Sequence, residues 1–447
     1  MSFIKKLIPG FILKPLRPFY HGLNAIIASW YYGRPSEKLV VIGITGTVGK
    51  STTAAMLAHI LNGTATSPNP SLGGGGKTGY ITTVNFFDGD QDLINKHGLS
   101  MPGGWLLQKQ LKAMLNNGCK YAIVECTSEG LAQNRHLGIN FDIALFTNLS
   151  YAHIEAHGTF GNYKLAKARL FETLAKCGKK SFFPEKMIGV NFDDPMSGYF
   201  LGFLSQKRFG VSFRNIAIST VDRVFHAVKH DDGAPAEFEM EGVEFCLNIL
   251  GKFNSANAAL AATCANMLGM DLAQIAKSLS TFRGVPGRME NISNNLGVTI
   301  IVDYGCEPES IRSSLESAAQ LPRKKLIHVF GSTGGHRDVS KRFVFGKTSA
   351  QYADEIIVTN DDVYDSDPER IAGNIVEGIK SFTLREPPYK VVLDRRQAIH
   401  QALAEAKKGD VVLITGKGSE QFLVLPANQR IDWDDRKVVR EELARLE

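Results

Sequence analysis

Residues 41–61 read VIGITGTVGKSTTAAMLAHIL, and this stretch decides the class of fold. The apolar run 39–44 is typical of a buried strand, and the Ala/Leu-rich stretch after the turn is typical of a helix. Between them lies a short Gly/Thr turn that ends in Lys50–Ser51–Thr52. A strand, a glycine-rich turn and a helix in this order predict a phosphate-binding loop.

The loop is a shortened variant of the usual phosphate loop. The full spacing would put a glycine at position 44, where this chain has Ile44, so the pattern is G-T-x-G-K-S. Lys50 is expected to neutralise the β- and γ-phosphates, and the Ser51 hydroxyl is expected to ligate Mg²⁺. The nucleotide-binding residues expected here are Gly46, Thr47, Gly49, Lys50, Ser51 and Thr52.

The composition indicates a globular protein with more than one domain. Of its 447 residues, 44% are hydrophobic and 21% are charged, and a chain of this length exceeds one ordinary core. The net charge of +6 is mild and the basic residues are dispersed, which argues against a nucleic-acid partner. The six cysteines form no C-x-x-C pair, which predicts reduced thiols in a cytoplasmic protein.

Residues 1–37 form a basic and apolar N-terminal arm. Pro9, Pro15, Arg17 and Pro18 interrupt its apolar run, so it is expected to be neither a signal peptide nor a membrane-spanning helix. Two interpretations remain. The arm is either a helix packed on the next domain or an interfacial segment that gives the protein a peripheral membrane contact.

From residue 38 onward, short β-branched runs alternate with helical patterns. The predicted strands are 39–44, 121–125, 142–147, 299–303, 325–330, 355–358, 390–393 and 410–415. Continuous apolar strands separated by helices predict parallel sheets that are covered on both faces. The stretch 282–297 is rich in Gly, Pro and Asn, and we expect the main domain boundary there.

Further motifs follow the loop in a fixed order. They are VECTSEGLAQNR (124–135), TNLSYAHIEAHGTFGNYKLAKARLF (147–171), GKFNSANAALAA (251–262), PGRME (286–290), VDYGCEPESI (302–311), VFGSTGGHRDVSKR (329–342), TNDDVYDSDPE (359–369), DRRQAI (394–399), GKGSEQ (416–421) and DWDDRKVVREEL (432–443). Over residues 38–447 the chain resembles the Mur ligase family, and in particular its UDP-N-acetylmuramoyl-tripeptide synthetases. The family's N-terminal uridine-binding domain has no counterpart in the 37 residues before the loop domain.

The resemblance implies an α/β fold with two main parts. A P-loop-type, mostly parallel-sheet ATPase domain is expected over residues 38–287, after the arm 1–37. A Rossmann-like α/β C-terminal domain is expected over residues 288–447. The implied location is the cytoplasm, and the interfacial interpretation of the arm would place the protein at the inner face of the membrane.

The resemblance also implies the chemistry, which is amide formation between a carboxylate and an amine. ATP phosphorylates the carboxylate, and the amine then attacks the acyl phosphate. A carboxylate is a poor electrophile and phosphorylation gives it a good leaving group, but the enzyme must then hold several anions together with cations. The implied cofactors are ATP and Mg²⁺, with two ions.

Family motifs carry several roles onto residues of this chain. The catalytic residues so implied are Lys50, His153, Lys167 and Arg288, and the metal ligands are Ser51, Glu125, His153 and Lys167. Lys167 matches a lysine that captures CO₂ and becomes a carboxylate-like ligand. Arg288 matches a hinge arginine that reaches the γ-phosphate. Asn254 and Asn257 match adenine-side residues, and Asp303 matches an acid that holds the ribose, with a structural strand-end role as its alternative.

Two substrate sites are implied in the same way. The residues for the muramoyl-peptide acceptor are Ser100, Met101, Ser128, Gln133 and Arg135. The residues for the incoming amino acid are Arg337, Asp361, Asp362, Gly416 and Glu420. The implied reaction joins the D-glutamyl carboxylate of a muramoyl-dipeptide to a lysine-like diamino acid or to meso-diaminopimelate. The alternatives are a pseudomurein, lipid-linked or folyl-glutamate acceptor, or a non-catalytic membrane-associated scaffold.

The chain differs from the family at the residues that are implied to bind the incoming amino acid. The family motif D-N-P-R is Asp361–Asp362–Val363–Tyr364 here, so the arginine that forks onto the distal carboxylate of meso-diaminopimelate is replaced. A tyrosine cannot make that bidentate contact. An acid-rich pocket without this arginine predicts that lysine or ornithine is used at least as well as meso-diaminopimelate.

Overall fold

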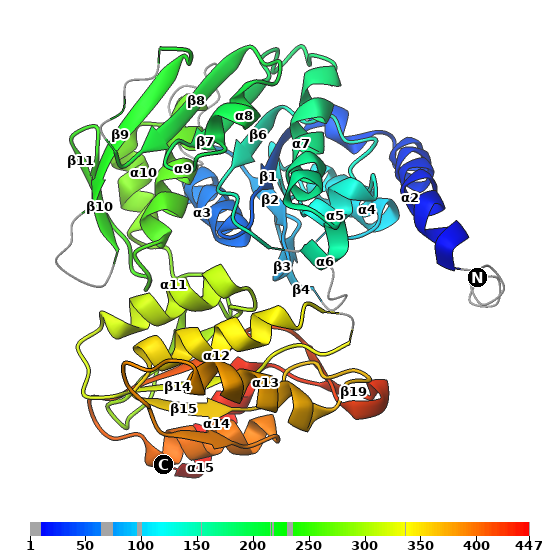
Figure 1. Cartoon of the computed structure of the whole chain (residues 1–447). Coiled ribbons are helices and arrows are strands. Elements are labelled where there is room, and N and C mark those ends of the chain that lie inside the picture. Colours follow the sequence, from blue (N-terminus) through cyan, green and yellow to red (C-terminus); the bar gives the residue numbers. More distant parts are fainter. Residues whose placement is uncertain are drawn as a thin grey trace. The chain divides into compact units, whose positions relative to one another are not determined.

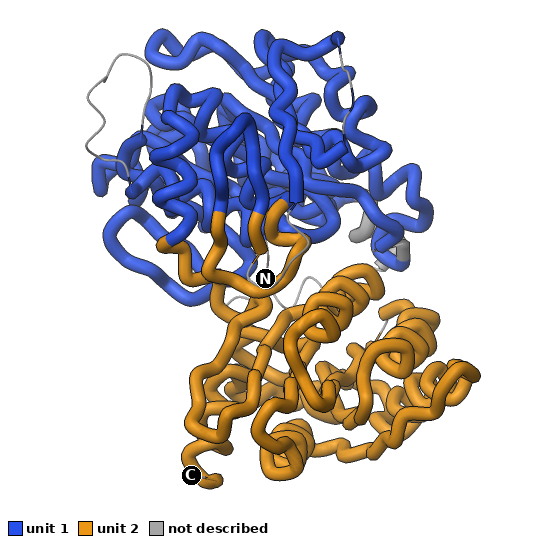
Figure 2. The backbone as a smooth tube through the Cα atoms, turned by 90° about the vertical axis from the view of Figure 1, so that its left-hand side faces the viewer, with its two compact units in different colours: residues 1–229, 238–245, 256–280 blue, residues 230–237, 246–255, 281–447 orange. Residues whose placement is uncertain are grey.

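The structure is a computed structural model that describes residues 10–63, 75–95, 101–152, 154–214, 216, 219–229, 236–335 and 337–446. The chain divides into two compact units (Figure 2). Unit 1 comprises residues 1–229, 238–245 and 256–280, and unit 2 comprises residues 230–237, 246–255 and 281–447. The helix α9 begins in unit 2 and continues into unit 1.

The described residues of unit 1 form an eleven-stranded sheet in the order β11-β10-β9-β8-β7-β6-β1-β5-β2-β3-β4 (Figure 1). Its strands are β1 (Val40–Thr45), β2 (Thr78–Ile81), β3 (Asn85–Phe87), β4 (Asp92–Ile94), β5 (Tyr121–Glu125), β6 (Ile143–Phe146), β7 (Met187–Asn191), β8 (Lys207–Ser212), β9 (Arg223–Lys229), β10 (Glu237–Met240) and β11 (Val243–Cys246). The run from β9 to β2 is parallel, whereas β3, β4 and β10 pair antiparallel at the two ends.

Helices cover this sheet and its central strands are fully buried. The helices are α2 (Gly10–Tyr31), α3 (Lys50–Gly63), α4 (Gly104–Asn116), α5 (Ser128–Ala132), α6 (Ile154–His157), α7 (Phe160–Lys176), α8 (Ser197–Leu201), α9 (Asn254–Met267) and α10 (Leu272–Leu279), with a short 3₁₀ turn at Pro35–Lys38. One apolar core joins β1, β5 and β6 to α4 and α7. From Gly10 to Tyr31 the arm forms the helix α2, which packs on α4 as one of the two interpretations expected.

The described residues of unit 2 form a six-stranded sheet in the order β12-β13-β17-β14-β15-β16. The strands are β12 (Glu290–Ile292), β13 (Thr299–Asp303), β14 (Leu326–Phe330), β15 (Glu355–Val358), β16 (Tyr389–Val391) and β17 (Val411–Thr415), and β18 (Phe422–Val424) pairs with β19 (Arg430–Asp432) in a separate hairpin. All neighbours in the sheet are parallel except β12 and β13.

The sheet of unit 2 has a core on each face. The helices are α11 (Pro308–Ala319), α12 (Ser340–Tyr352), α13 (Pro368–Lys380), α14 (Arg395–Glu405) and α15 (Asp435–Leu446), with a 3₁₀ turn at Pro426–Asn428. One core contains α11, α12 and α13, and the other contains α14 and α15. The fold class expected from the sequence, a mostly parallel ATPase domain followed by a Rossmann-like domain, is confirmed.

All eight predicted strands are present with small shifts at their ends. The strands β2–β4, β7–β12, β18 and β19 were not predicted. In β9, RVFHAVK, only Phe225 and Ala227 are buried, so the strand carries no continuous apolar run. The strand β2 begins at Thr78, and residues 64–74 before it lie outside the described residues. All six cysteines are free thiols, as expected.

Candidate functional site

The carboxyl ends of parallel strands carry the candidate site residues in both units. In unit 1, β1 leads into the phosphate loop and β5 ends at Glu125. In unit 2, β13 ends at Asp303, β15 is followed by Asp361, and β17 is followed by Gly416. Ligands of open α/β sheets bind at this edge.

The phosphate loop fits tightly against its neighbours. A Cβ on Gly46 would lie 1.9 Å from Thr147 Oγ1, and one on Gly49 would lie 2.1 Å from Asn257 Oδ1. Gly49 also has φ +83°, which a residue with a side chain adopts only with strain. The side chain of Asn148 fixes the loop, because its Oδ1 accepts from the backbone N–H of Val48 at 3.0 Å.

The hydroxyl of Ser51 and the carboxylate of Glu125 meet beside this loop. Ser51 Oγ donates to Glu125 Oε2 at 2.7 Å, and both side chains are buried. Thr83 holds the same carboxylate, with its N–H 2.8 Å from Oε2 and its hydroxyl 2.9 Å from Oε1. Hydroxyl and carboxylate oxygens are the hard ligands that Mg²⁺ takes, so this pair suits that ion.

Lys167 extends from α7 and is 1% exposed. Its Nζ donates to the carbonyl of Gly46 at 2.6 Å and lies 4.5 Å from the centre of the Tyr163 ring. Burial is the main cause that lowers the pKa of Lys167 well below its usual value, and the Lys50 ammonium lowers it further. Burial of this kind favours the neutral, nucleophilic form of the amine.

Lys50 and Thr52 lie in the first turn of α3, directly after the loop. The Nζ of Lys50 donates to the carbonyl of Thr47 at 2.7 Å. His153 and Ser100, which the sequence placed in the metal and acceptor sites, lie outside the described residues. Within those residues, no group of three or more His, Cys, Asp or Glu side chains could hold a metal ion.

Three of the acceptor residues contact one another. Arg135 donates from Nη1 to the carbonyl of Met101 at 2.6 Å and from Nη2 to Gln133 Oε1 at 2.8 Å. Burial lowers the pKa of Arg135. Ser128 lies at the start of α5, where its hydroxyl is 3.0 Å from Nε2 of His157. The sequence interpretation did not assign a role to this pairing.

Arg288 belongs to unit 2. Its guanidinium lies 4.1 Å from the centre of the Tyr304 ring, and its Nε is buried and has no hydrogen-bond partner among the described residues. Glu420 is the largest cause that raises the pKa of Tyr304 well above its usual value. A buried donor without a partner is costly, so Arg288 is suited to an anionic ligand.

The carboxylate of Asp303 is already occupied within unit 2. Oδ1 accepts from the N–H of Met289 at 2.8 Å, and Oδ2 accepts from the N–H of Gly305 and from Ser314 Oγ, both at 2.8 Å. This network is what the structural alternative for Asp303 expects.

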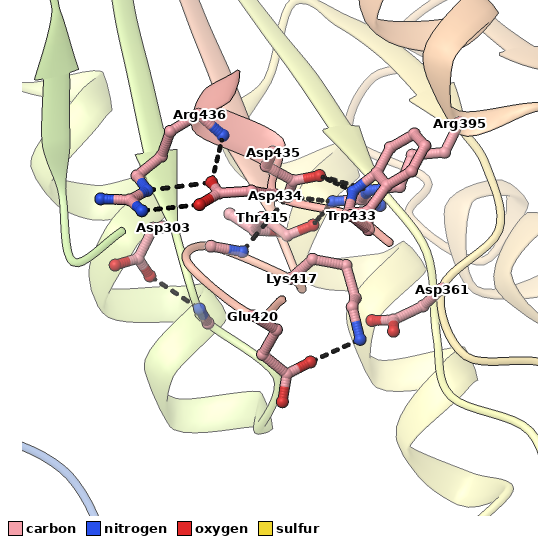
Figure 3. Close-up of polar contacts among 12 residues, drawn as sticks. Asp303, Asp361, Arg395, Thr415, Lys417, Glu420, Trp433, Asp434, Asp435 and Arg436 are labelled. Carbon is pink, nitrogen blue, oxygen red and sulfur yellow. Dashed lines mark hydrogen bonds and ion pairs between the residues drawn. The ribbon is translucent and has the colours of Figure 1, made fainter. Parts of the chain in front are cut away.

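The amino-acid residues surround a lysine that the sequence interpretation passed over (Figure 3). Lys417 is fully buried, and its Nζ lies 2.9 Å from Asp362 and 2.5 Å from Glu420. Burial opposes the charge of Lys417, but Glu420 and Asp361 outweigh it and raise the pKa of Lys417. The sequence indicated three acids in this region, Asp361, Asp362 and Glu420. The Lys417 ammonium pairs with two of them, Asp362 and Glu420, so the region is less acidic than the sequence indicated.

Gly416, Tyr364 and Arg337 complete this region. Gly416 has φ +119°, which a residue with a side chain adopts only with strain, and a Cβ there would lie 2.8 Å from Asp361 Oδ2. Burial, followed by the charge of Asp362, raises the pKa of Tyr364, and Arg337 opposes this effect. The letters GKGSEQ already contained Lys417, whereas nothing in the sequence pattern marked Thr83, which reaches Glu125 across the β2–β3 turn.

The two adenine-side asparagines lie in different units. Asn254 Nδ2 donates to the carbonyl of Leu250 at 2.7 Å in unit 2. Asn257 lies in unit 1 against the phosphate loop, where its Oδ1 is 3.4 Å from Thr53 Oγ1.

Two family models match the chain. The model described as the Mur ligase middle domain matches residues 44–265, and the model described as the Mur ligase, glutamate ligase domain, matches residues 287–418. Together they cover most of both units.

Curated relatives agree with these models. The UDP-N-acetylmuramoyl-L-alanyl-D-glutamate–2,6-diaminopimelate ligase of Gloeobacter violaceus is 36% identical, and the match covers 95% of this chain and 81% of the relative. The enzyme of the same name from Geobacillus kaustophilus is 32% identical over 93% of this chain and 81% of its own length. A solved structure of a ligase with this name has a TM-score of 0.58 and 27% identity, and covers 91% of this chain and 79% of that one.

Proposed function

The chain belongs to the Mur ligase family and is an ATP-dependent ligase that forms amide bonds, and from this premise we propose its substrates and the roles of its residues. It activates the D-glutamyl carboxylate of a muramoyl-dipeptide as an acyl phosphate and joins it to a diamino acid, lysine-like or meso-diaminopimelate. The names of the relatives above give UDP-N-acetylmuramoyl-L-alanyl-D-glutamate and 2,6-diaminopimelate as the two molecules that those enzymes join, which supports the proposal. The observation that carries the proposal is the contact of Ser51 with Glu125 beside the phosphate loop.

ATP binding falls to the phosphate loop. Backbone N–H groups of Gly46, Gly49 and Thr52 lie at or near the N-terminus of α3, which favours anions. The N–H of Thr47 donates to the carbonyl of Asn148 at 2.9 Å. Lys50 adds a full positive charge for the β- and γ-phosphates. Asn257, packed on Gly49, and Asn254 are proposed for the nucleotide base. The three hydrogen bonds that the carboxylate of Asp303 accepts within unit 2 favour its structural role over the ribose contact.

Two Mg²⁺ ions are proposed, held by Ser51, Glu125, His153 and Lys167. Bound ions would neutralise phosphate charge during phosphoryl transfer. Lys167 would serve as a ligand only after its neutral amine has reacted with CO₂ and become a carbamate. Its burial and lowered pKa support this, because a protonated ammonium could not react.

Two groups of residues are proposed to bind the reacting partners. Ser100, Met101, Ser128, Gln133 and Arg135 hold the acceptor, and Arg337, Asp361, Asp362, Gly416 and Glu420 hold the amino acid. Arg288, whose Nε lacks a partner, is proposed to reach the γ-phosphate.

The proposed domains are the arm 1–37, the ATP-binding domain 38–287 and the C-terminal domain 288–447. The proposed location is the cytoplasm, at the inner face of the membrane. No nucleic acid is expected among the partners.

The test is an ADP-release assay with product masses read by mass spectrometry. UDP-muramoyl-dipeptide, a lipid-linked muramoyl-dipeptide and folyl-glutamate are offered as acceptors, each with lysine, ornithine and meso-diaminopimelate. We expect ADP release only when a muramoyl-dipeptide and a diamino acid are both present, and its loss in Lys50→Ala. The exposed-face variant Lys437→Ala is the matched control. Turnover with folyl-glutamate alone, or no ADP release with any pair, would contradict the proposal.

A further inference from the structure

The helix α2 packs on unit 1 through its small residues. Gly22, Ala25, Ala28 and Ser29 are its buried positions, and they occur at helical spacing. The contact with α4 is close, since a Cβ on Gly104 would lie 2.4 Å from the Cα of Ala25. The face of α2 that packs on unit 1 therefore consists of small residues and contains none of the large apolar side chains of the helix.

The opposite face of α2 carries the large apolar side chains, and they are exposed. These residues are Leu16, Phe19, Tyr20, Leu23, Ile26, Ile27, Trp30 and Tyr31, with exposed fractions between 41% and 72%. They recur every three or four positions and thus form one continuous stripe. In most globular proteins the apolar stripe of a helix packs against the core. Because the stripe of α2 is exposed instead, it indicates a binding partner with an apolar surface.

Aromatic side chains gather at the C-terminal end of the stripe. The rings of Tyr31 and Trp105 meet edge to face at 5.4 Å, and Trp105 also donates from Nε1 to Asn24 at 3.2 Å. The guanidinium of Arg34 lies 3.7 Å from the centre of the Trp30 ring. Trp, Tyr and Arg in this combination are enriched where a protein meets the headgroup region of a bilayer.

The positive charge of the arm distinguishes between two apolar partners, a second copy of the chain and a lipid bilayer. Lys5, Lys6, Lys14, Arg17 and Arg34 are its charged residues before position 36, and this stretch contains no Asp or Glu. A second copy of the chain would bring these cations against each other, and residues 1–35 of either copy contain no acid to pair with them. An anionic bilayer offers both the apolar depth and the opposite charge.

We propose that α2 lies in the surface of an anionic lipid bilayer, with its outward stripe among the acyl chains and its arginines at the phosphate groups. This deepens the proposed location at a membrane face and rests on that part of the proposed function alone. The helices in the described part of the chain lack the length and apolarity to cross a bilayer, so the contact is peripheral.

Vesicle co-sedimentation of the full chain tests the proposal. The probes are vesicles of phosphatidylcholine with and without about one third phosphatidylglycerol. We expect binding to the anionic vesicles that weakens as salt is added, because exposed charges are screened. The variant Leu23→Glu/Ile27→Glu should lose binding by about tenfold or more, since two apolar anchors become acids.

The matched control is Leu204→Glu/Leu384→Glu, which makes the same change at two exposed leucines outside α2. It should bind vesicles like the unchanged chain. Lipids brominated on the acyl chains should quench Trp30 and Trp105 but leave Trp433 unaffected.

Three results would overturn the proposal: no binding to anionic vesicles, equal loss in both double variants, or a dimer that the α2 variant dissociates without any vesicle binding. ADP release is measured on the same samples without lipid. It should be unchanged in both variants, so a failure of the ligase assignment is seen separately from a failure of the membrane contact.

Discussion

At the scale of single residues, Lys167 links the fold to the proposed chemistry. It is a buried lysine that touches the phosphate loop through Gly46 and carries a lowered pKa. A purely structural lysine would gain nothing from such a pKa, whereas an amine that takes up CO₂ needs it. The structure thereby gives a physical reason for a role that the sequence supplied only through a resemblance.

Replacing Lys167 tests that role directly. Lys167→Ala should reduce ligation by several orders of magnitude while ATP binding is largely retained, because Lys50 and the loop amides remain. A ¹³C carbamate resonance from ¹³C-bicarbonate should be present in the unchanged chain and absent in this variant. The control Lys164→Ala removes a lysine on the same helix that lies over Tyr199. Full ligation by Lys167→Ala would rule out the carbamate.

We predict that Tyr364 sets which amino acid the enzyme prefers. It stands where the family has an arginine, and Lys417 neutralises part of the acidic charge around it. Tyr364→Arg should shift the ratio of kcat/KM toward meso-diaminopimelate by about 1–3 kcal/mol, the worth of a charged hydrogen bond. Tyr364→Phe keeps the ring and should leave the ratio as it was. An unchanged preference for meso-diaminopimelate in all three proteins would show that another residue reads the distal carboxylate.

His328 provides a pH dependence with a defined sign. Nδ1 lies 2.8 Å from Ser349 Oγ and Nε2 lies 3.0 Å from Thr415 Oγ1, and burial lowers the pKa of His328 to about 3. The unfolded chain binds this proton below pH ~6.5 and the folded chain does not. The free energy of unfolding should therefore fall between pH ~6.5 and 4, with a slope that approaches about 1.4 kcal/mol per pH unit.

Urea titrations at pH 7 and 5 measure this slope. His328→Gln should show a smaller loss of stability over the same interval, although it is less stable at both values. An identical pH slope in the two proteins would mean that His328 does not stay neutral in the folded chain.

At the scale of elements, one buried ion pair ties α15 to the sheet of unit 2. Arg395 Nε and Nη2 donate to the two carboxylate oxygens of Asp435 at 2.8 and 2.7 Å, and Nη2 also reaches the carbonyl of Thr415 (Figure 3). Both side chains are fully buried, so neither charge has water to compensate it if the partner is lost. The pair also holds the N–H of Gly418, next to Lys417.

Asp435→Ala should therefore destabilise unit 2 by about 3–5 kcal/mol, because it leaves Arg395 charged and buried. Urea unfolding followed by the fluorescence of Trp433, which donates to Asp435 Oδ1 at 2.8 Å, reports on this region. Glu309→Ala breaks an exposed pair with Arg312 and should cost less than about 1 kcal/mol. If the two variants lose similar amounts of unfolding free energy, the buried pair contributes no more to stability than the exposed pair.

At the scale of the whole molecule, the arm is part of the fold as well as a surface. Ser36 accepts from the N–H of Asn140 at 3.1 Å, and Asn134 Nδ2 donates to the carbonyl of Pro18 at 3.3 Å. Asn134 is a neighbour of Gln133 and Arg135 in sequence. The segment proposed to meet lipid is thus directly connected to the segment proposed to hold the acceptor.

Deleting residues 1–36 should lower the melting temperature of unit 1 and leave the unfolding of unit 2 unchanged. The deletion uncovers the α4 surface that Ala25 and Ala28 bury, while unit 2 has its own two cores. Differential scanning calorimetry separates the transitions. Deleting residues 1–9 alone removes none of these contacts and serves as the control. A truncated protein with an unaltered unit 1 transition would show that the packing of α2 contributes nothing.

The sequence by itself determined the local features of this protein. The phosphate loop, the central strands and the motif order follow from runs of adjacent residues, because apolar continuity and glycine placement are readable within a few positions. The strand β9 escaped prediction, since it buries only Phe225 and Ala227 and its pairing is set by other strands of the sheet.

Only the tertiary structure decided which side chains meet. Thr83 on Glu125, Lys417 between Asp362 and Glu420, and the occupied carboxylate of Asp303 depend on strand ends that are brought together by the sheet. The same holds for α2, whose stripe is visible in the sequence while its direction is not. An amphipathic helix has the same sequence period whether its apolar face packs on the core or is exposed to solvent. In α2 the small residues pack on unit 1, so the large apolar side chains are exposed.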